Sequence, residues 1–466
     1  MIRNSRNIFY FGHLLLDTGL VVLTFAALTW TMGGKEFPDL TLFDLGFMLY
    51  LVTVWYFASR AHGLYADRVP VNLFREWVST MKCLAVHTVL MVIFIFVFSN
   101  NQYSRGFVSV YVLALAALMP IGKVVLKQVF NWLYKKGILR RRTVVIGDGS
   151  TGERFYEYIS NHRQYGYQAV RFIKDGLNLK SAATAALLYQ KIGRYDEVDE
   201  VFIAESETGA YNTRTLANTL MSHYAARLRI IPNTFGSTAA SPYRIGTLGE
   251  YPVLSLRNEP LEDPYNVLVK RVFDIAFSLM VLVFICSWLF PIIALAVKLD
   301  SRGPVFFRQE RWGKRNRPFM CLKFRSMRAA AKDTDENGKF QQARKNDSRI
   351  TKVGAFLRKT SLDEFPQFIN VLLGDMSIVG PRPHATLMNK EAAEVVSNYL
   401  ARHQAKPGIT GWAQVNELRG ESGDVELLKK RVEHDIWYIE HWSFLLDLKI
   451  VFRTVWNVLV GDDNAY

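Results

Sequence analysis

The chain has 466 residues, half of them hydrophobic and 13% aromatic, and it carries a formal net charge of +15. This combination predicts a membrane protein whose basic aqueous face suits anionic lipid and anionic substrates, with about three domains expected from the length. The basic residues alternate with apolar spans and no nucleic-acid motif occurs, so we expect no nucleic acid as a partner. The three cysteines, Cys83, Cys286 and Cys321, lie far apart, which indicates neither a disulfide framework nor a zinc site.

Four apolar stretches open the chain, over residues 8–32, 42–59, 83–98 and 107–128. The first is too long for the core of a signal peptide, and we predict four retained transmembrane helices. Basic residues gather before the first span, between the second and third, and after the fourth, so the positive-inside rule places both ends of this bundle in the cytoplasm. His13 and Asp17 lie one helical turn apart in the first span, where they are either functional groups or partners in a hydrogen bond between helices.

From residue 143 the pattern changes to short apolar runs that alternate with polar helical stretches. This alternation predicts a small parallel α/β domain of the Rossmann-like kind. The expected strands cover residues 143–149, 167–173, 200–204 and 227–233, and the expected helices lie near residues 152–162, 181–192 and 212–225.

A GxGxxG pattern, formed by Gly147, Gly149 and Gly152, follows the first of these strands and precedes a helix. There the amides of a helix end could hold a pyrophosphate. Asp175 lies roughly where a ribose-binding acid would fall, although in a polar turn. The same glycines could instead let the strand pack closely on its helix, so the pattern leaves both interpretations open.

A second apolar region, residues 272–297, is long enough to cross a bilayer. However, Lys270 and Arg271 stand before it and several basic residues follow it, so both ends carry the cytoplasmic signature. Pro291 lies inside the run, where it removes a backbone donor and predicts a break. We therefore predict a re-entrant helix–break–helix hairpin over residues 266–299 instead of a fifth crossing.

Two adjacent carboxylates, Asp363 and Glu364, lie between basic residues. A carboxylate can attack a phosphorus atom only if cations offset the repulsion between two anions, and Arg358, Lys359 and Arg382 can supply those cations. The pair therefore predicts phosphate chemistry. The alternative is structural, because the Ser-x-x-Glu spacing that ends at Glu364 fits a capping box that would merely start a helix.

Further basic residues accompany the pair. Lys323 and Arg325 alternate along a predicted strand and would share one face, while two prolines would hold Arg382 in a stiff segment that aims its guanidinium at phosphate oxygens. The candidate residues for binding substrate phosphate or nucleotide are Lys323, Arg325, Arg358, Pro381, Arg382 and Pro383.

Several motifs of the C-terminal part resemble those of one protein family. They are KRVFD (270–274), GPVFFRQERWG (303–313), KFRSM (323–327), NDSRITKVGAFLRKTSLDEFPQ (346–367), GDMSIVGPRP (374–383) and KPGITGWAQV (406–415). Through them, most of residues 266–466 resembles the bacterial sugar transferase family, the polyprenyl-phosphate hexose-1-phosphate transferases. The likeness is greatest to the undecaprenyl-phosphate glucose phosphotransferases of exopolysaccharide synthesis.

The resemblance implies a mechanism. Asp363 would attack the β-phosphate of a UDP-hexose and release UMP, and undecaprenyl phosphate would then take the phosphosugar from the carboxylate. Glu364, together with Asp363, is expected to bind Mg²⁺, the implied cofactor. The implied partners are UDP-hexose, undecaprenyl phosphate and membrane lipid. The sequence does not decide the oligomeric state, and a homodimer is our expectation. The implied location is the bacterial inner membrane, with the catalytic domain on the cytoplasmic face.

The resemblance also completes the expected architecture. We expect a four-helix transmembrane bundle (1–135), a Rossmann-like accessory domain (140–260), the re-entrant hairpin (266–299) and an α+β catalytic domain (300–466). The family usually has Ser-Pro at the break of its hairpin. Here Ser287 is followed by Trp288, and the proline is Pro291, so these residues mark the expected break.

Other functions remain as alternatives. The same reaction with galactose 1-phosphate is the first alternative to glucose 1-phosphate, because sugar hydroxyl groups are recognised by no short motif in this chain. A membrane-bound, NAD-dependent nucleotide-sugar dehydratase or epimerase would also combine apolar helices with a nucleotide-binding domain, but the chain contains no Tyr-x-x-x-Lys pair. The third alternative is a non-enzymatic membrane scaffold in which the two acids only cap a helix.

Overall fold

The computed structural model describes residues 5–33, 41–65, 73–98, 103–136, 141–162, 166–174, 198–208, 212–223, 226–233, 244–328, 331, 347–418 and 425–460. Asp175 and the helix expected near residues 181–192 lie outside the described residues. The chain forms two compact units, one of residues 1–141 with 158–168 and the other of residues 142–157 with 169–466. Each unit is described by itself.

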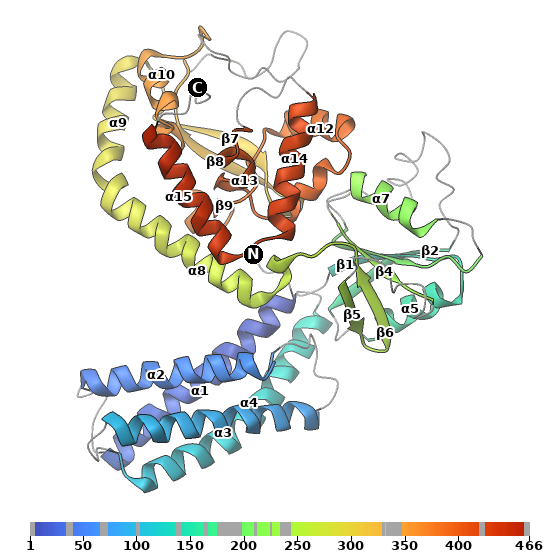
Figure 1. Ribbon diagram of the computed structural model, residues 1–466, viewed down its shortest axis with the longest axis vertical. Coiled ribbons are helices and arrows are strands. Elements are labelled where there is room, and N and C mark those ends of the chain that lie inside the picture. Colours follow the sequence, from blue (N-terminus) through green and yellow to red (C-terminus); the bar gives the residue numbers. More distant parts are fainter. Residues whose placement is uncertain are drawn as a thin grey trace. The chain divides into compact units, whose positions relative to one another are not determined.

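Four long helices build the first unit (Figure 1), namely α1 (Ser5–Gly33), α2 (Leu42–Ala61), α3 (Leu73–Phe98) and α4 (Arg105–Lys135). Each contains a stretch long and apolar enough to cross a membrane, yet between 22% and 39% of each stretch is buried inside the protein. Apolar side chains therefore cover the outside of these helices as well as their shared core, which is the pattern of helices that face lipid.

Polar side chains inside this unit tie the helices together. The Asp17 carboxylate of α1 accepts a hydrogen bond from the Tyr65 hydroxyl at 2.7 Å, and its Oδ2 lies 3.8 Å from the Nζ of Lys123 in α4. Lys123 also donates to the Thr80 hydroxyl of α3 at 2.6 Å. His13 instead bonds to the Phe9 carbonyl within its own helix. Of the two roles considered in the sequence analysis, the structure therefore gives Asp17 that of a hydrogen-bonding partner between helices, because its partners lie on other segments.

A six-stranded sheet with strand order β2-β1-β3-β4-β6-β5 follows in the chain. Strands β1, β3 and β4 are parallel, and their residues form a buried core with α7. The four expected strands are present, and β5 with β6 adds an antiparallel hairpin that the sequence analysis missed. The elements are β1 (Arg141–Ile146), α5 (Ser150–Asn161), β2 (Tyr167–Ile173), β3 (Glu200–Ala204), α7 (Thr213–His223), β4 (Arg227–Ile231), β5 (Arg244–Leu248) and β6 (Tyr251–Ser255).

The C-terminal part of the second unit packs helices around two small sheets, the antiparallel pair β7–β8 and the parallel pair β9–β10. We call residues 300–460 the catalytic fold. In chain order, its elements are β7 (Phe306–Trp312), η5 (Lys314–Asn316), β8 (Pro318–Phe324), α10 (Lys352–Lys359), η6 (Leu362–Glu364), α11 (Gln367–Leu373), β9 (Ser377–Val379), α12 (Thr386–Val395), η7 (Tyr399–Gln404), β10 (Gly408–Thr410), α13 (Trp412–Val415), α14 (Val425–Glu440) and α15 (Phe444–Val460).

The apolar region before the catalytic fold is one helical run, α8 (Pro264–Val281), the π-helical turn η4 (Leu282–Cys286) and α9 (Ser287–Asp300). Figure 1 shows this run curving along the catalytic fold. The expected break at Ser287 and Pro291 takes another form, since both residues lie inside α9 and the irregularity precedes them. A proline inside a helix clashes with the preceding turn, and a widened turn relieves that clash without ending the helix.

Both ends of this helical run are bound to the catalytic fold. Near the start of α8, Lys270 Nζ donates to the Val379 carbonyl at 3.0 Å, and Arg271 Nη1 donates to the Val371 carbonyl at 2.6 Å. At the end of α9, the Asp300 carboxylate accepts from the Val353 amide at 3.0 Å. The charges of the KRVFD motif therefore serve internal bonds as well as flanking an apolar span.

Candidate active site

The carboxylate pair lies in the short helical turn η6, directly after α10. Ser361 connects the two with a left-handed backbone, φ 56°, a conformation that costs a non-glycine residue of the order of 1 kcal/mol. Leu362 packs on the cluster formed by α9, β8 and α10, which fixes the turn. Ser361 makes no side-chain cap bond. The capping-box alternative is therefore wrong, and the turn instead presents the two acids that follow.

Glu364 is locked between two cations. Its Oε1 accepts from Lys323 Nζ at 2.7 Å and from Arg382 Nη2 at 2.6 Å, and its Oε2 accepts from Arg382 Nη1 at 3.2 Å. Burial pushes the pKa of Glu364 upward, but the charges and hydrogen bonds of Arg382 and Lys323 hold it well below its usual range. The side chain is therefore ionised, and its forked contact with the guanidinium fixes the direction of Arg382.

Asp363 has a different environment, although it is the neighbouring residue. Its side chain is buried, 7% exposed, and among the described residues nothing donates a hydrogen bond to its carboxylate. Burial raises the pKa of Asp363, and the Glu364 carboxylate raises it further, while the charges of Lys323, Arg358 and Arg382 act in the opposite direction. A carboxylate that is desolvated, unbonded and near three cations has its lone pairs free for an incoming phosphorus atom.

Lys323 reaches the pair from β8, which is held against α11 by one side chain. The Asn370 side chain of α11 accepts from the Leu322 amide at 2.9 Å and donates to the Met320 carbonyl at 2.8 Å. Asn370 thus takes the place of a neighbouring strand along β8. This arrangement places Lys323, the next residue of the strand, beside η6 as the sequence analysis expected.

Arg382 is positioned by two motifs whose backbones are in direct contact. The IVGPRP and KPGITG segments pair as β9 and β10, and a Cβ atom on Gly408 would lie 2.1 Å from the backbone nitrogen of Gly380. Only glycine permits this approach. The Gly408 amide donates to the Pro381 carbonyl at 3.0 Å. Pro381 and Pro383 are both buried. Arg382 therefore lies between two prolines that are shielded from solvent.

Two of the basic candidates lie differently. Arg325 is buried and donates to the carbonyl oxygens of Ser301, at 2.6 Å, and Val297, at 3.2 Å, so it caps the end of α9 and does not reach the carboxylates. Arg358, at the end of α10, is half-buried and acts on Asp363 through its charge. Of the six basic and proline candidates, the structure therefore brings Lys323 and Arg382 into contact with the pair and gives Arg325 another task.

The pair fits a Mg²⁺ ion of the kind that one or two carboxylates hold together with substrate phosphates. A carboxylate offers about four acceptor positions, and three hydrogen bonds occupy those of Glu364, leaving one on Oε2. The Asp363 carboxylate lies next to it. Within the described part of the chain, no group of three or more His, Cys, Asp or Glu side chains gathers to form a cage made by protein alone, so substrate oxygens would have to complete the coordination.

The glycine-rich loop before α5 already holds an anion, which is a side chain of the protein itself. The Glu207 carboxylate accepts from the backbone N–H groups of residues 150–151 at 3.1 and 2.8 Å, and a Cβ on Gly149 would lie 2.2 Å from it. Gly147 and Gly152 approach so closely that a Cβ on either would lie 3.0 Å from the other. The glycines therefore provide the close packing that the sequence analysis gave as their second interpretation.

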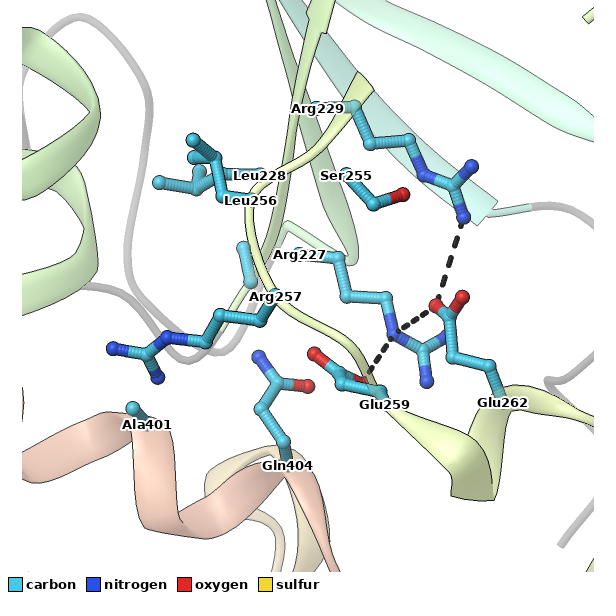
Figure 2. A pocket seen from close by; sticks show the side chains of 11 residues that line it. Arg227, Leu228, Arg229, Ser255, Leu256, Arg257, Glu259, Glu262, Ala401 and Gln404 are labelled. Carbon is cyan, nitrogen blue, oxygen red and sulfur yellow. Dashed lines mark hydrogen bonds and ion pairs between the residues drawn. The ribbon is translucent and has the colours of Figure 1, made fainter. Parts of the chain in front are cut away.

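A small cavity of ≈ 40 Å³ lies elsewhere, between strands β4 and β6 and the helical turn η7 (Figure 2). Arg227 lines it and pairs with Glu259 at 3.3 Å and Glu262 at 2.8 Å, while Ala401 and Gln404 of η7 form its other side. Its lining includes neither of the two adjacent carboxylates. It is too small for a nucleotide sugar, and its charges are paired.

Buried histidines make the catalytic fold sensitive to acid. Burial lowers the pKa of His403 to about 3, and the charge of Arg402 adds to that shift, whereas an unfolded histidine titrates near 6.5. Below pH 6.5 the unfolded chain binds a proton that the folded chain does not, so the free energy of unfolding falls by up to about 1.4 kcal/mol per pH unit. We expect His403→Gln to flatten the fall of the melting temperature between pH 6.5 and pH 4, and equal slopes would contradict this.

Glu364 is held by two cations, and the neighbouring Asp363 accepts no hydrogen bond from the described residues. This arrangement, on a fold bound to long apolar helices, suits a membrane-bound phosphotransferase. A family model described as bacterial sugar transferase matches residues 265–461, and one described as a CoA-binding domain matches residues 60–205. The chain is 40% identical to the UDP-glucose:undecaprenyl-phosphate glucose-1-phosphate transferase of Escherichia coli over 358 residues, 75% of each chain.

Two further relatives extend the comparison. The enzyme of the same name from Xanthomonas campestris pv. campestris is 36% identical over 423 residues, 88% of this chain and 84% of the relative. The undecaprenyl-phosphate galactose phosphotransferase of Salmonella typhimurium is 29% identical over 439 residues, 90% of this chain and 88% of the relative. The chain belongs to the bacterial sugar transferase family.

Proposed function

We propose that this protein transfers glucose 1-phosphate from UDP-glucose to undecaprenyl phosphate and so starts the synthesis of an exopolysaccharide or capsule. The observation that carries the proposal is the unequal pair, in which Glu364 is ionised and held by Lys323 and Arg382 while Asp363 is buried and accepts no hydrogen bond from the residues that the structure describes. Such a pair separates the two tasks that the chemistry needs, attack and charge neutralisation.

In the first step, an oxygen of the Asp363 carboxylate attacks the β-phosphorus of the donor. An oxygen–phosphorus bond forms, the bond from that phosphorus to the bridging oxygen breaks, and the electron pair leaves on UMP. Lys323 and Arg382 are placed to neutralise the phosphate oxygens, and the burial of Asp363 keeps water from competing.

In the second step, a phosphate oxygen of undecaprenyl phosphate attacks the same phosphorus, and the Asp363 carboxylate leaves unchanged. One site thus serves a soluble donor and a lipid acceptor in turn, and ping-pong kinetics follow. Mg²⁺, held by Glu364 and Asp363 with substrate oxygens, would neutralise the diphosphate and stabilise the leaving UMP.

The helical run α8–η4–α9 supports a re-entrant hairpin. The run is 37 residues long and would measure about 55 Å as a straight helix, well over the ~30 Å hydrocarbon core. Both ends are bound to the catalytic fold through Arg271 and Asp300, whereas Phe284 and Trp288 near the middle are 73% and 57% exposed. A segment that dips into the bilayer and returns satisfies all three observations and keeps Asp363 near lipid headgroups.

The location follows from the same reasoning. UDP-sugars are cytoplasmic substrates, so we place the catalytic fold on the cytoplasmic face of the inner membrane, with α1–α4 as a four-helix transmembrane bundle in a homodimer. Glucose is the favoured sugar because the relatives that are 35–40% identical over most of the chain are named for it. Galactose is the second candidate, through the relative at 29% identity.

The test is UMP release by the full chain in detergent, with undecaprenyl phosphate, Mg²⁺ and a panel of UDP-sugars. We expect UDP-glucose to give the highest kcat/KM and the products to be UMP and undecaprenyl diphosphate glucose. UMP release from no member of the panel would contradict the reaction class. A higher kcat/KM with UDP-galactose would contradict the choice of sugar alone.

A further inference from the structure

Behind the segment that carries Arg382 lies a buried ion pair. Arg402 of η7 and Asp435 of α14 approach to 2.6 Å between Nη2 and Oδ2, with side chains 1% and 2% exposed. The same Nη2 donates to the backbone carbonyl of Arg382 at 2.8 Å. Resting on the function proposed above, we propose that Arg402, fixed by Asp435, is a positioning residue that holds Arg382 in the direction required for the donor diphosphate.

The segment depends on such a contact because of its own composition. Pro381 and Pro383 have no N–H group, so the chain around Arg382 cannot be fixed by a regular ladder of backbone donors. Its three carbonyl oxygens are fixed instead, that of Pro381 by the Gly408 amide, that of Arg382 by Arg402 and that of Pro383 by Arg311. Of the two arginines, only Arg402 acts on the peptide unit from which the catalytic guanidinium projects.

Arg402 itself is held rigidly. Its Nη1 donates to His384 Nδ1 at 2.8 Å and to the Tyr399 hydroxyl at 3.3 Å. Tyr399 in turn donates to Asn389 at 2.7 Å, and Asn389 donates to the His384 carbonyl at 3.1 Å. These bonds restrict the orientation of the guanidinium, and the Arg382 carbonyl to which Arg402 donates is restricted with it.

A buried ion pair is weak evidence for a role in stability. Taking two charges out of water is costly, and replacing both partners by apolar residues of similar size is often neutral or stabilising. Orientation and stability can therefore be separated by experiment, because the double variant Arg402→Met with Asp435→Leu removes the donor to the Arg382 carbonyl together with the carboxylate that pairs with it.

The experiment measures UMP release by the full chain in detergent, together with its melting temperature. We expect the double variant to melt close to the wild type and to lose about 10- to 100-fold in kcat, with KM changed less. In an Arg382→Ala background the same double change should add no more than about 2-fold, because the residue that it positions is gone. Full kcat in a folded double variant, or effects that multiply, would overturn the proposal.

A matched control uses the buried ion pair of Lys270 and Asp447, also 2.6 Å long and with side chains 9% and 0% exposed, which contacts none of residues 381–383. Lys270→Met with Asp447→Leu should lower UMP release only as far as it lowers the folded fraction. Hydrogen exchange of the Arg382, His384 and Ala385 amides gives a readout that needs no activity. Faster exchange in the Arg402 variant than in the control supports the proposal even if no UDP-sugar proves to be a donor, and equal exchange overturns it.

Discussion

Replacing Asp363 by Asn is expected to abolish UMP formation and sugar-phosphate transfer, with a loss of at least about 10³-fold, while the protein stays folded. Asparagine has the same shape but no nucleophilic carboxylate. Among the described residues the Asp363 side chain has no hydrogen-bond donor to lose, and its burial penalises the charged form. The neutral amide should therefore leave the melting temperature equal or slightly higher.

Two measurements check this expectation. In the absence of lipid acceptor, the wild type should retain label from a UDP-sugar labelled in its β-phosphate, and Asp363→Asn should retain none. Asp375→Asn is the matched control, because Asp375 is an exposed carboxylate twelve residues further along, and it should behave as the wild type. Label on the Asp363→Asn protein would assign the nucleophile to another residue.

Replacing Glu364 by Gln should lower the rate of UMP release by about 10²- to 10³-fold and remove most of its dependence on Mg²⁺. Glutamine keeps the length of the side chain, but it carries no negative charge, and its NH₂ group cannot accept the bond that Arg382 Nη1 donates to Oε2. Of these two cations, Arg382 is 36% exposed and Lys323 16% exposed, so water can partly hydrate them and the fold should survive with a lower melting temperature.

The measurement is a Mg²⁺ titration of UMP release after removal of metal by a chelator. Wild-type activity should disappear with the metal and return with it, while the Glu364→Gln protein should respond weakly. Glu391→Gln, an exposed change on α12, serves as the control and should titrate as the wild type. An unchanged midpoint and amplitude for Glu364→Gln would assign the metal to other ligands.

The large apolar elements could be predicted because their signal is local. A run of apolar residues predicts a helix that faces lipid, and short apolar runs between polar stretches predict β1 to β4, since each pattern reports the surroundings of its own segment. The hairpin β5–β6 was missed, because its partly exposed strands show no clear alternation. A break was predicted at Ser287 and Pro291, whereas the structure has a π-helical turn at Leu282–Cys286 and keeps both residues inside α9.

For the charged residues the outcome depended on contacts that no pattern contains. Lys323 and Arg325 are two residues apart in one motif, yet one bonds to Glu364, 41 residues away in the chain, and the other caps α9. The sequence analysis did not select Arg402 as a candidate, yet in the structure this residue donates to the Arg382 carbonyl.

The sequence by itself therefore determined the membrane-facing helices, the α/β pattern of the middle region and the adjacency of Asp363 and Glu364, because these depend on hydrophobic periodicity and on neighbouring residues. Only the tertiary structure decided which acid bonds to two cations and which accepts no hydrogen bond from the described part of the chain. The reason is that the energy of a charge depends on its desolvation and on the charges within a few ångströms, and folding brings those charges together from distant parts of the chain.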